Sequence, residues 1–285
     1  MSLTTRIAIR RRTMNAAMLG LTAACATVAV GLLFFILGYL VYQGASSLNV
    51  AFFTRLPAPV GEAGGGMVNA IIGSAKLLTL AALVGIPVGF LAGVYIAEYS
   101  SRRTAILLRY TGDLLNGVPS IVIGILAYSL VVLPMGHFST IAGGIALGIM
   151  MVPITVRGTE EFLRAVPPSL REASLALGAR RWVTIARVVV PAASRGIFTT
   201  MALGLARVAG ETAPLLFTAL NNRYWSHGWT EPTASLPVMI YTYATSPYDD
   251  WIRQAWAAAL VLVAVVLAAN VGGRLLLSPR RTAAR

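Results

Sequence analysis

Two opposite charges lie four residues apart in one of the most apolar stretches of the chain. Arg207 and Glu211 fall within the run Gly196–Leu220. A charged side chain in the middle of a membrane-spanning helix costs about 2.5–3.5 kcal/mol on insertion scales, so it persists mainly where it faces a cavity or a partner. Because residues four apart share one face of a helix, we expect these two side chains to be close enough to pair.

Two roles are open for this pair. In the first, an ion pair fixes the packing of neighbouring helices and does nothing more. In the second, the guanidinium group of Arg207 binds an oxyanion through its planar fork of N–H donors, and Glu211 masks the charge until the site is occupied. Pro214 should loosen the helix just beyond the pair. We favour the second role, in which Arg207 and Glu211 belong to a substrate pathway.

Residue types that would support other chemistry are scarce. The only lysine, Lys76, is not part of a G-K-[ST] nucleotide-binding motif, and we expect it to reach the lipid headgroups from near the end of an apolar run. His137 and His227 lie far apart and outside any H-E-x-x-H pattern, and the only cysteine, Cys25, excludes a disulfide within the chain. We therefore expect no catalytic residue, no metal site and no cofactor in this chain.

The composition indicates an integral membrane protein that is all-α. Of 285 residues, 57% are hydrophobic and 12% are charged, and the mean hydropathy is +0.75, more apolar material than a soluble domain of this size can bury. A membrane-spanning helix needs about 20 mostly apolar residues. Six stretches meet this requirement: Met14–Tyr42, Val68–Ala97, Leu114–Leu133, Phe138–Val156, Gly196–Leu220 and Ala255–Leu277.

The arginines indicate which way the chain crosses the bilayer. The net charge is +13, but the basic residues lie between apolar spans, which favours a topology signal over nucleic-acid binding. With a cytoplasmic N-terminus, 18 arginines fall on inner segments and only Arg55, Arg223 and Arg253 on outer ones. By the positive-inside rule both termini are then cytoplasmic. The first apolar run is nearly twice as long as a signal-peptide core, so we expect an uncleaved span.

The spans divide the chain into segments. These are a basic cytoplasmic N-terminus (1–13), a first transmembrane helix (14–42), a core of five transmembrane helices (68–277) and a cytoplasmic tail (278–285). The core includes a long cytoplasmic loop, 157–195. Glycines in the second span, such as Gly85, Gly89 and Gly93, would let neighbouring helices approach closely.

The long loop, 157–195, has a pattern of its own. After two prolines, Ser169 and Glu172 form a capping-box pattern, which predicts a short helix over Leu170–Leu177 that ends at Gly178 in a left-handed conformation. Such a helix is marginal in water and needs a partner to hold it. The next segment suits a helix at the membrane surface, ended by Pro191. The simpler alternative is an ordered interfacial loop whose arginines serve only topology.

The loop also resembles a known signature. The residues E-A-S-L-A-L-G-A from Glu172, with hydrophobic residues up to Pro191, are similar to the E-A-A-x-x-x-G loop of binding-protein-dependent ABC importer permeases. The chain departs from that pattern at Ser174, where a second alanine is usual, and at Val188 and Val190. In that family the short helix docks into a groove on a cytoplasmic ATPase subunit. The resemblance implies that coupling role for Leu170, Arg171, Glu172, Ala173, Ser174, Leu177 and Gly178.

A closer resemblance covers nearly the whole chain beyond the first span. The sequence R-V-A-G-E-T-A-P at 207–214 is similar to the fifth-span motif of PstA-type phosphate permeases, and N-G-V-P-S at 116–120 and the segment 64–74 look like other marks of that family. The resemblance implies the type I ABC importer permease fold, in the plasma membrane of a bacterium. It also implies that Arg207 and Glu211 are the sensitive membrane charges.

The same resemblance implies a set of partners. These are a homologous PstC-type permease, two copies of a PstB-type ATPase that bind ATP and Mg, and an extracytoplasmic phosphate-binding protein. The imported substrate would be inorganic phosphate. Arg223, His227 and Glu231 lie in the predicted outer loop before the last span and are candidates for contact with the binding protein.

Other functions remain as alternatives. An importer for sulfate or molybdate would share the same features. A proton-coupled transporter in which Glu211 titrates would work without ATPase subunits, which the signature of the long loop argues against. An intramembrane protease lacks support, because the chain has no G-x-S-x-G or H-E-x-x-H motif.

Overall fold

The computed structural model describes the backbone of residues 3–276 and the side chains of residues 11–272. The expected tail, 278–285, lies outside the described residues. Within them the chain is helical, and its only β-type pairing is an isolated bridge between Pro57 and Gly65. In chain order the helices are α1 (Leu3–Ala45), α2 (Val50–Thr54), α3 (Val68–Val94), η1 (Tyr95–Tyr99), α4 (Arg102–Gly117), α5 (Ser120–Ala127), η2 (Tyr128–Val132), α6 (Leu133–Met135), α7 (Thr140–Arg164), α8 (Pro168–Ala176), α9 (Arg181–Thr184), η3 (Ile185–Val189), α10 (Val190–Ala209), α11 (Ala213–Leu216), α12 (Leu236–Ala244) and α13 (Asp249–Leu276), where η marks a π-helix.

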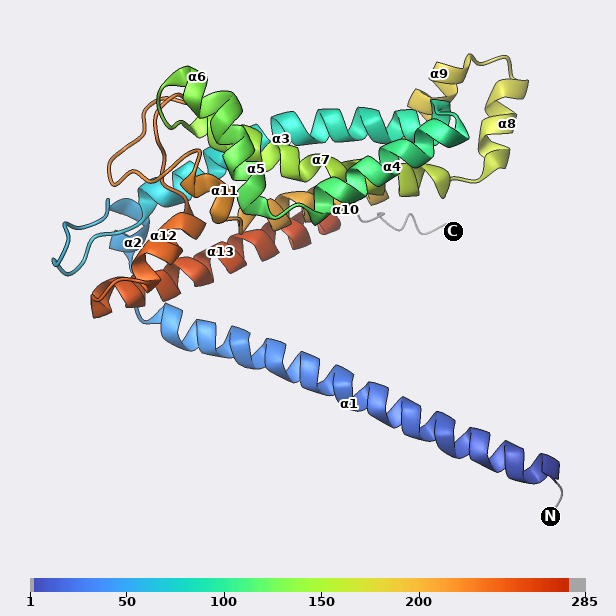
Figure 1. Ribbon diagram of the computed structural model, residues 1–285, viewed down its shortest axis with the longest axis horizontal. Helices are drawn as coiled ribbons and strands as arrows, with labels where there is room; N and C mark the ends of the chain where they lie inside the picture. Colours follow the sequence, from blue (N-terminus) through green and yellow to red (C-terminus); the bar gives the residue numbers. More distant parts are fainter. Residues whose placement is uncertain (1–2, 277–285) are drawn as a thin grey trace, which may run out of the picture.

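The described helices are long and apolar enough for five or six membrane crossings. Five single helical stretches qualify by length and composition, and the pair α4 and α5–α6 makes a sixth if it counts as one bent span. The bundle has two ends (Figure 1). One end, the α8 end, carries α8 and α9, and the opposite end, the α12 end, carries α2, α12 and the longer loops.

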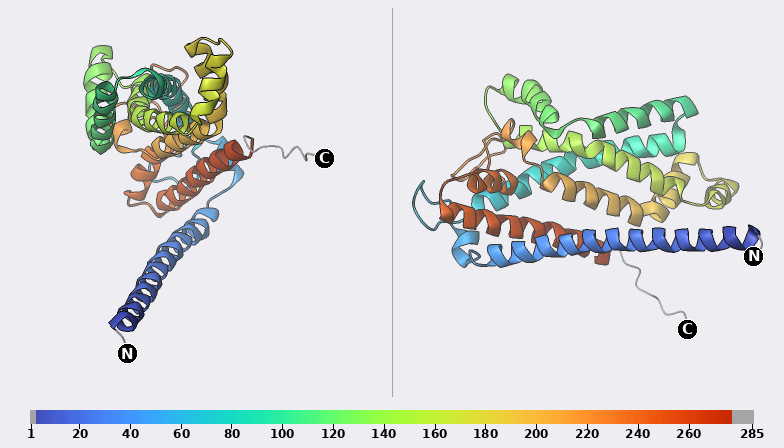
Figure 2. Two further views of the ribbon diagram at one scale, coloured as in Figure 1. Left: turned by 90° about the vertical axis from the view of Figure 1, so that its right-hand side faces the viewer. Right: turned by 60° about the horizontal axis from the view of Figure 1, so that its bottom comes forward.

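Helix α1 stands apart from the bundle along most of its length (Figures 1 and 2). Residues 11–36 are exposed. Contact with α13 is made at the C-terminal end of α1, where the ring of Tyr39 lies edge-on to Trp256 with 5.3 Å between centroids. A Cβ atom on Gly44 would lie 2.8 Å from the carbonyl oxygen of Trp256, so the two backbones nearly touch there.

Helices α3 and α7 form the centre of the bundle and pack through small residues. Gly85, Gly89 and Gly93 recur every four residues on one face of α3, and each faces a side chain of α7. A Cβ atom on Gly89 would lie 2.5 Å from the Cβ atom of Thr155. Repeats of small residues at this spacing bring two membrane helices into close contact, as the sequence predicts for these glycines.

We expect Gly89→Leu to lower the thermal stability of the protein markedly, whereas Gly20→Leu should leave it nearly unchanged. The leucine would force α3 and α7 apart, and overpacking of this kind costs about 1–3 kcal/mol of unfolding free energy. Gly20 lies in α1 with nothing within 4 Å of its Cβ position. Thermal unfolding in detergent, followed by size-exclusion chromatography, gives the two midpoints. Equal midpoints would contradict the close packing of α3 on α7.

The third predicted span is not one helix, which corrects the expectation of a continuous span over Leu114–Leu133. Helix α4 begins earlier, at Arg102, and ends at Gly117, and the chain then turns by 98° into α5. The physical reason is Pro119, which precedes α5, supplies no N–H group and keeps the residue before it out of the helical region.

The fifth predicted span is also displaced, because a helical stretch runs from Arg181 to Ala209 instead of from Gly196 to Leu220. The expected surface helix ended by Pro191 is therefore wrong. Pro191 lies in the first turn of α10, directly after the π-helix η3. A π-turn shifts the hydrogen-bond register of a helix, and the first turn of an α-helix tolerates a residue without an N–H group.

The segment between α11 and α13 is partly helical and partly buried. It contains α12, which packs on α13, and Tyr243 of α12 is only 3% exposed. The ring of Tyr243 stacks on Trp251 with 4.3 Å between centroids. Tyr243 is therefore part of the core at the α12 end.

Lys76 also has a different role from the one expected. Its Nζ atom donates a hydrogen bond to the carbonyl oxygen of Ser226 at 2.6 Å and lies 5.9 Å from the ring centroid of Trp229. Lys76 therefore holds the loop between α11 and α12 against α3, and it does not reach for lipid headgroups.

Candidate functional site

A pocket of about 150 Å³ lies where two helical stretches are interrupted next to each other. One interruption separates α4 from α5, and the other separates α10 from α11. Broken helices at membrane depth leave backbone groups unpaired, and they are tolerated where they line a cavity or a pathway. The pocket is lined by Leu115, Asn116, Val118, Ser120, Ile123, Met150, Arg207, Val208 and Glu211.

Arg207 and Glu211 reach this pocket in a different way from the one predicted. Arg207 lies in the last turn of α10, whereas Glu211 follows Gly210, where the helix has already ended. The two residues therefore do not share a helix face, and among the ion pairs of the described residues none joins them. The helix ends early because Gly210 disfavours helix and Pro214 opens a new one, α11.

The charges of the pocket are available to a ligand. Within the described part of the chain, the side chains of Arg207 and Glu211 form no hydrogen bond or ion pair. Arg207 is exposed and Glu211 is half-buried. A cation is favoured at the C-terminal end of a helix, where Arg207 lies. The pocket thus offers a guanidinium group that can donate several hydrogen bonds to an oxyanion.

Asn116 and Ser120 complete the polar lining, and sequence reasoning did not assign them to the pathway. Asn116 belongs to the last turn of α4, and Ser120 begins α5. An amide and a hydroxyl group can both donate hydrogen bonds to an anion. The signal that points to them is the sequence N-G-V-P-S itself, since glycine and proline two residues apart in an apolar run predict a break in the helix.

Gly124 brings the two interrupted helices together. A Cβ atom on Gly124 of α5 would lie 2.6 Å from the Cα atom of Pro214 in α11. The break after α4 is therefore held against the break after α10 by direct backbone contact, and this contact positions the pocket between them.

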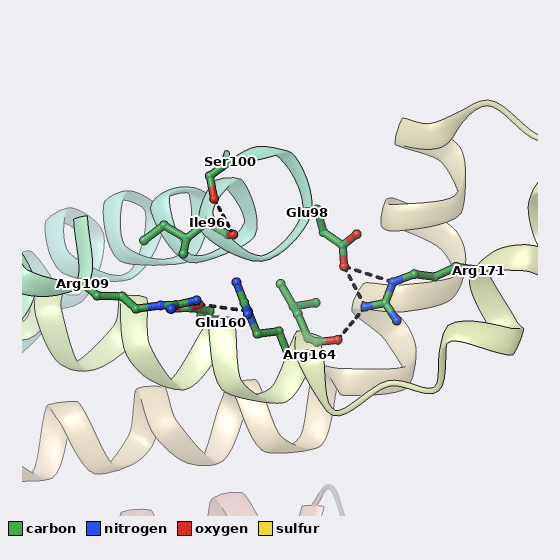
Figure 3. Close-up of polar contacts among 8 residues, drawn as sticks. Ile96, Glu98, Ser100, Arg109, Glu160, Arg164 and Arg171 are labelled. Atoms are coloured by element: carbon green, nitrogen blue, oxygen red, sulfur yellow. Dashed lines mark hydrogen bonds and ion pairs between the residues drawn. The ribbon is translucent and has the colours of Figure 1, made fainter. Parts of the chain in front are cut away.

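A charge network fixes α4 to α7 nearer the α8 end (Figure 3). Glu160 of α7 is buried and pairs with Arg109 of α4, and also with Arg164 at 3.0 Å. One turn further along, Asp113 of α4 pairs with Arg157 of α7. The pairs Arg109–Glu160 and Asp113–Arg157 both cross between α4 and α7, so α4 is held to α7 while α5 turns away beyond Gly117.

The predicted short helix of the long loop is present as α8, with one correction at its start. It covers Pro168–Ala176, and Gly178 follows with φ of +81°. The capping box is wrong: the N-cap residue is Pro167, Ser169 lies inside the helix, and no side chain caps the first turn. Pro168 explains the shift, because proline is favoured in the first turn, where its missing N–H group has no helical partner.

The residues expected to act in coupling divide into two groups. The first group is exposed on the outer side of the loop, and the exposed fraction of Leu177 is 89%. This group consists of Leu170, Glu172, Ala173, Leu177 and Gly178. Arg171 and Ser174 face inward and are half-buried. Ser174 shares a hydrogen bond of 2.9 Å with the hydroxyl group of Thr184, which closes α8 against α9. The loop therefore presents an apolar outer surface on a supported frame.

Arg223, His227 and Glu231 are all exposed at the α12 end. Arg223 donates a hydrogen bond of 2.6 Å to the carbonyl oxygen of Ala58, and a carboxylate oxygen of Glu231 accepts one of 2.9 Å from the backbone N–H of His227. These three residues thus lie on one structured loop, which Lys76 attaches to α3.

Comparisons with known proteins agree in sequence and in fold. Residues 85–280 match the family described as binding-protein-dependent transport system inner membrane component. The chain is 43% identical over 266 residues to the phosphate transport system permease protein PstA of Yersinia pestis, covering 92% of this chain and 90% of that protein. It is 44% identical over 267 residues to the protein of the same name from Haemophilus influenzae, covering 93% and 94%.

Solved structures extend the likeness. A chain of a bacterial alginate ABC transporter, solved in complex with an alginate pentasaccharide-bound periplasmic protein, superposes with a TM-score of 0.64 at 17% identity, covering 94% of this chain and 95% of that one. A chain of the MetNI methionine ABC transporter in an inward-facing conformation gives 0.57 at 17% identity, covering 74% and 92%. At these identities the likeness concerns the fold.

Proposed function

The chain belongs to the PstA family of phosphate transport permeases, a multi-pass inner-membrane component of ABC importers with the type I permease fold, and we propose that it conducts inorganic phosphate into the cytoplasm. The observation that carries this proposal is the pocket between the two helix breaks, where the guanidinium group of Arg207 forms no ion pair with any described residue. Phosphate is an oxyanion, and a free guanidinium group at that depth offers it paired N–H donors.

The pocket provides the rest of a binding site for phosphate. We propose that Asn116 and Ser120 donate further hydrogen bonds from the α4–α5 side. We propose that the carboxylate of Glu211 accepts a hydrogen bond from a P–OH group of hydrogenphosphate, while Arg207 binds the charged oxygens. Both side chains would then contact the substrate, which explains why an apolar bundle keeps two charges here.

The energy source is proposed to lie on other chains. Leu170, Leu177 and the exposed positions beside them form the outer face of α8, which suits a groove on an ATPase subunit. We propose two PstB-type ATPase subunits that bind ATP and Mg, and a homologous PstC-type permease that completes the pathway. The α8 end is then cytoplasmic, in agreement with the arginine distribution. This chain itself would bind no cofactor.

The opposite end is proposed to receive an extracytoplasmic phosphate-binding protein. Arg223, His227 and Glu231 lie there on a loop held by Lys76, so its shape is set before a partner arrives. A preformed surface of this kind lowers the entropy lost on binding.

The proposal is tested by uptake into proteoliposomes that contain the complete complex. With the binding protein outside and ATP inside, we expect labelled phosphate to accumulate and labelled sulfate and molybdate to remain outside. Omitting ATP should abolish the uptake. Accumulation of sulfate or molybdate in preference to phosphate would assign the chain to another oxyanion, and uptake driven by a proton gradient without ATP would refute the ABC mechanism.

A further inference from the structure

Glu98 joins the long loop to the core of the bundle through its side chain. It lies in η1 at the end of α3, and its carboxylate is 8% exposed. One carboxylate oxygen accepts hydrogen bonds from Arg171 of α8, at 2.8 Å from Nη2 and 3.3 Å from Nε (Figure 3). Two donors on one acceptor, shielded from water, make this ion pair stronger than one on the surface.

Arg171 attaches α8 to the end of α7 as well. Its Nη1 atom donates to the carbonyl oxygen of Val166 at 2.6 Å, and its Nη2 atom donates to that of Leu163 at 2.7 Å. Leu163 lies in the last turn of α7 and Val166 lies just beyond its end, where carbonyl groups lack the donors of a following helical turn. One guanidinium group therefore connects α3, α7 and α8.

The second leg of the loop, after Gly178, returns to the same residue. Arg181 of α9 donates to the backbone carbonyl oxygen of Glu98. Its guanidinium group also lies over the ring of Tyr99, 5.1 Å from the centroid. The two legs of the loop, α8 and α9, are thus both attached to Glu98, one through its carboxylate and the other through its carbonyl group.

The local backbone explains why Glu98 can accept from both legs. Residues Tyr95–Tyr99 form the π-helix η1, a conformation that is rare in proteins and frequent at functional sites. In a π-turn each hydrogen bond skips one more residue than in an α-helix, which leaves carbonyl groups near the helix end free for outside donors. The carbonyl group of Glu98 is one of these.

A displacement at Glu98 has a direct route to the pocket. Helix α3 and η1 form one continuous helical stretch, Val68–Tyr99, which contains Pro87 and is packed on α7 through Gly85, Gly89 and Gly93. Further along α3, Leu77 and Ala81 belong to the same buried cluster as Val208, the neighbour of Arg207. A shift of α3 along its axis would therefore move the residues that support Arg207.

We propose that Glu98 is the positioning residue through which both legs of the long loop, α8 and α9, move α3. This inference rests on the proposed function, because it requires an ATPase subunit that displaces α8. Without the carboxylate of Glu98, α8 would be displaced by the ATPase but α3 would not follow, so ATP would be hydrolysed with little transport.

The test uses the complete complex in proteoliposomes and measures phosphate imported per ATP hydrolysed. We expect Glu98→Ala to lower this ratio about tenfold, within the range by which single residues modulate coupling between sites. Glu98→Gln keeps an oxygen that accepts from Arg171 and should restore a large part of the ratio. Arg187→Gln, which removes an exposed arginine on η3 of the same loop, should have no effect.

A second measurement reports on the geometry alone. With Cys25 replaced by serine, spin labels at Ala176→Cys on α8 and Leu91→Cys on α3 occupy exposed positions. We expect one narrow distance distribution, broadened by Glu98→Ala and by Arg171→Gln but not by Arg187→Gln. This readout requires no phosphate transport and remains informative if the substrate is a different anion.

The outcomes separate the two proposals. A wild-type complex that hydrolyses ATP without importing phosphate would refute the proposed function, and the label distances would still decide the role of Glu98. An unchanged transport ratio in Glu98→Ala, with or without broadened distances, would overturn the role of Glu98. If the complex with Glu98→Ala does not assemble, the same measurements are made on Glu98→Gln and Arg171→Gln. Normal coupling in Arg171→Gln would equally overturn the role of Glu98.

Discussion

Replacing Arg207 with alanine should reduce phosphate uptake at least about a hundredfold, since each hydrogen bond to a charged group contributes about 1.5–3 kcal/mol and the guanidinium group offers two or more. The complex should still assemble, because Arg207 is exposed to the pocket and forms no ion pair with the described residues. Uptake of labelled phosphate by proteoliposomes checks the first statement, and co-purification of the subunits checks the second.

Two variants serve as controls for Arg207→Ala. Arg207→Lys keeps the charge but loses the planar fork, so its uptake should fall between those of the wild type and the alanine variant. Arg195→Ala removes an exposed arginine from the same helix, α10, away from the pocket, and should transport normally. Normal uptake by Arg207→Ala would remove this arginine from the mechanism and leave the pocket as a gap in the packing.

Replacing Gly178 with proline should separate ATP hydrolysis from transport. Gly178 has φ of +81°, and its N–H group donates to the carbonyl oxygen of Leu175 at 2.9 Å. Proline holds φ near −65° and has no N–H group, so the end of α8 must be rebuilt. We expect the complex to reach the membrane and hydrolyse ATP, with phosphate imported per ATP about tenfold lower, within the range seen for residues that couple distant sites.

The control for this variant is Gly178→Asn. Asparagine adopts a left-handed conformation more readily than other residues with a side chain, and nothing lies within 4 Å of the Cβ position of Gly178. Its transport ratio should stay close to that of the wild type. Should the proline variant keep the same ratio as well, α8 would not act as a lever between the ATPase and the spans.

Features of the fold that depend only on residues close together in the chain were predicted better than features that depend on distant residues. Gly178 ends α8 as expected, because a left-handed turn after a short helix depends on neighbouring residues alone. The close approach of α3 and α7 also follows from a local repeat of glycines. The N-cap of α8 was missed because two signals competed locally, the capping box at Ser169 and the first-turn preference of Pro168, and the proline prevailed.

The sequence alone determined that the chain is all-α and crosses the membrane several times, since the length and apolarity of each run decide that independently of its neighbours. The sequence also predicted that the charged residues Arg207 and Glu211 belong to a substrate pathway. Only the tertiary structure showed that these two residues line one pocket with Asn116 and Ser120, next to two helix breaks, and that Glu98 holds both legs of the long loop. The reason is physical: these contacts join residues distant in the chain, and the packing of helices, rather than any local preference, decides which of them meet.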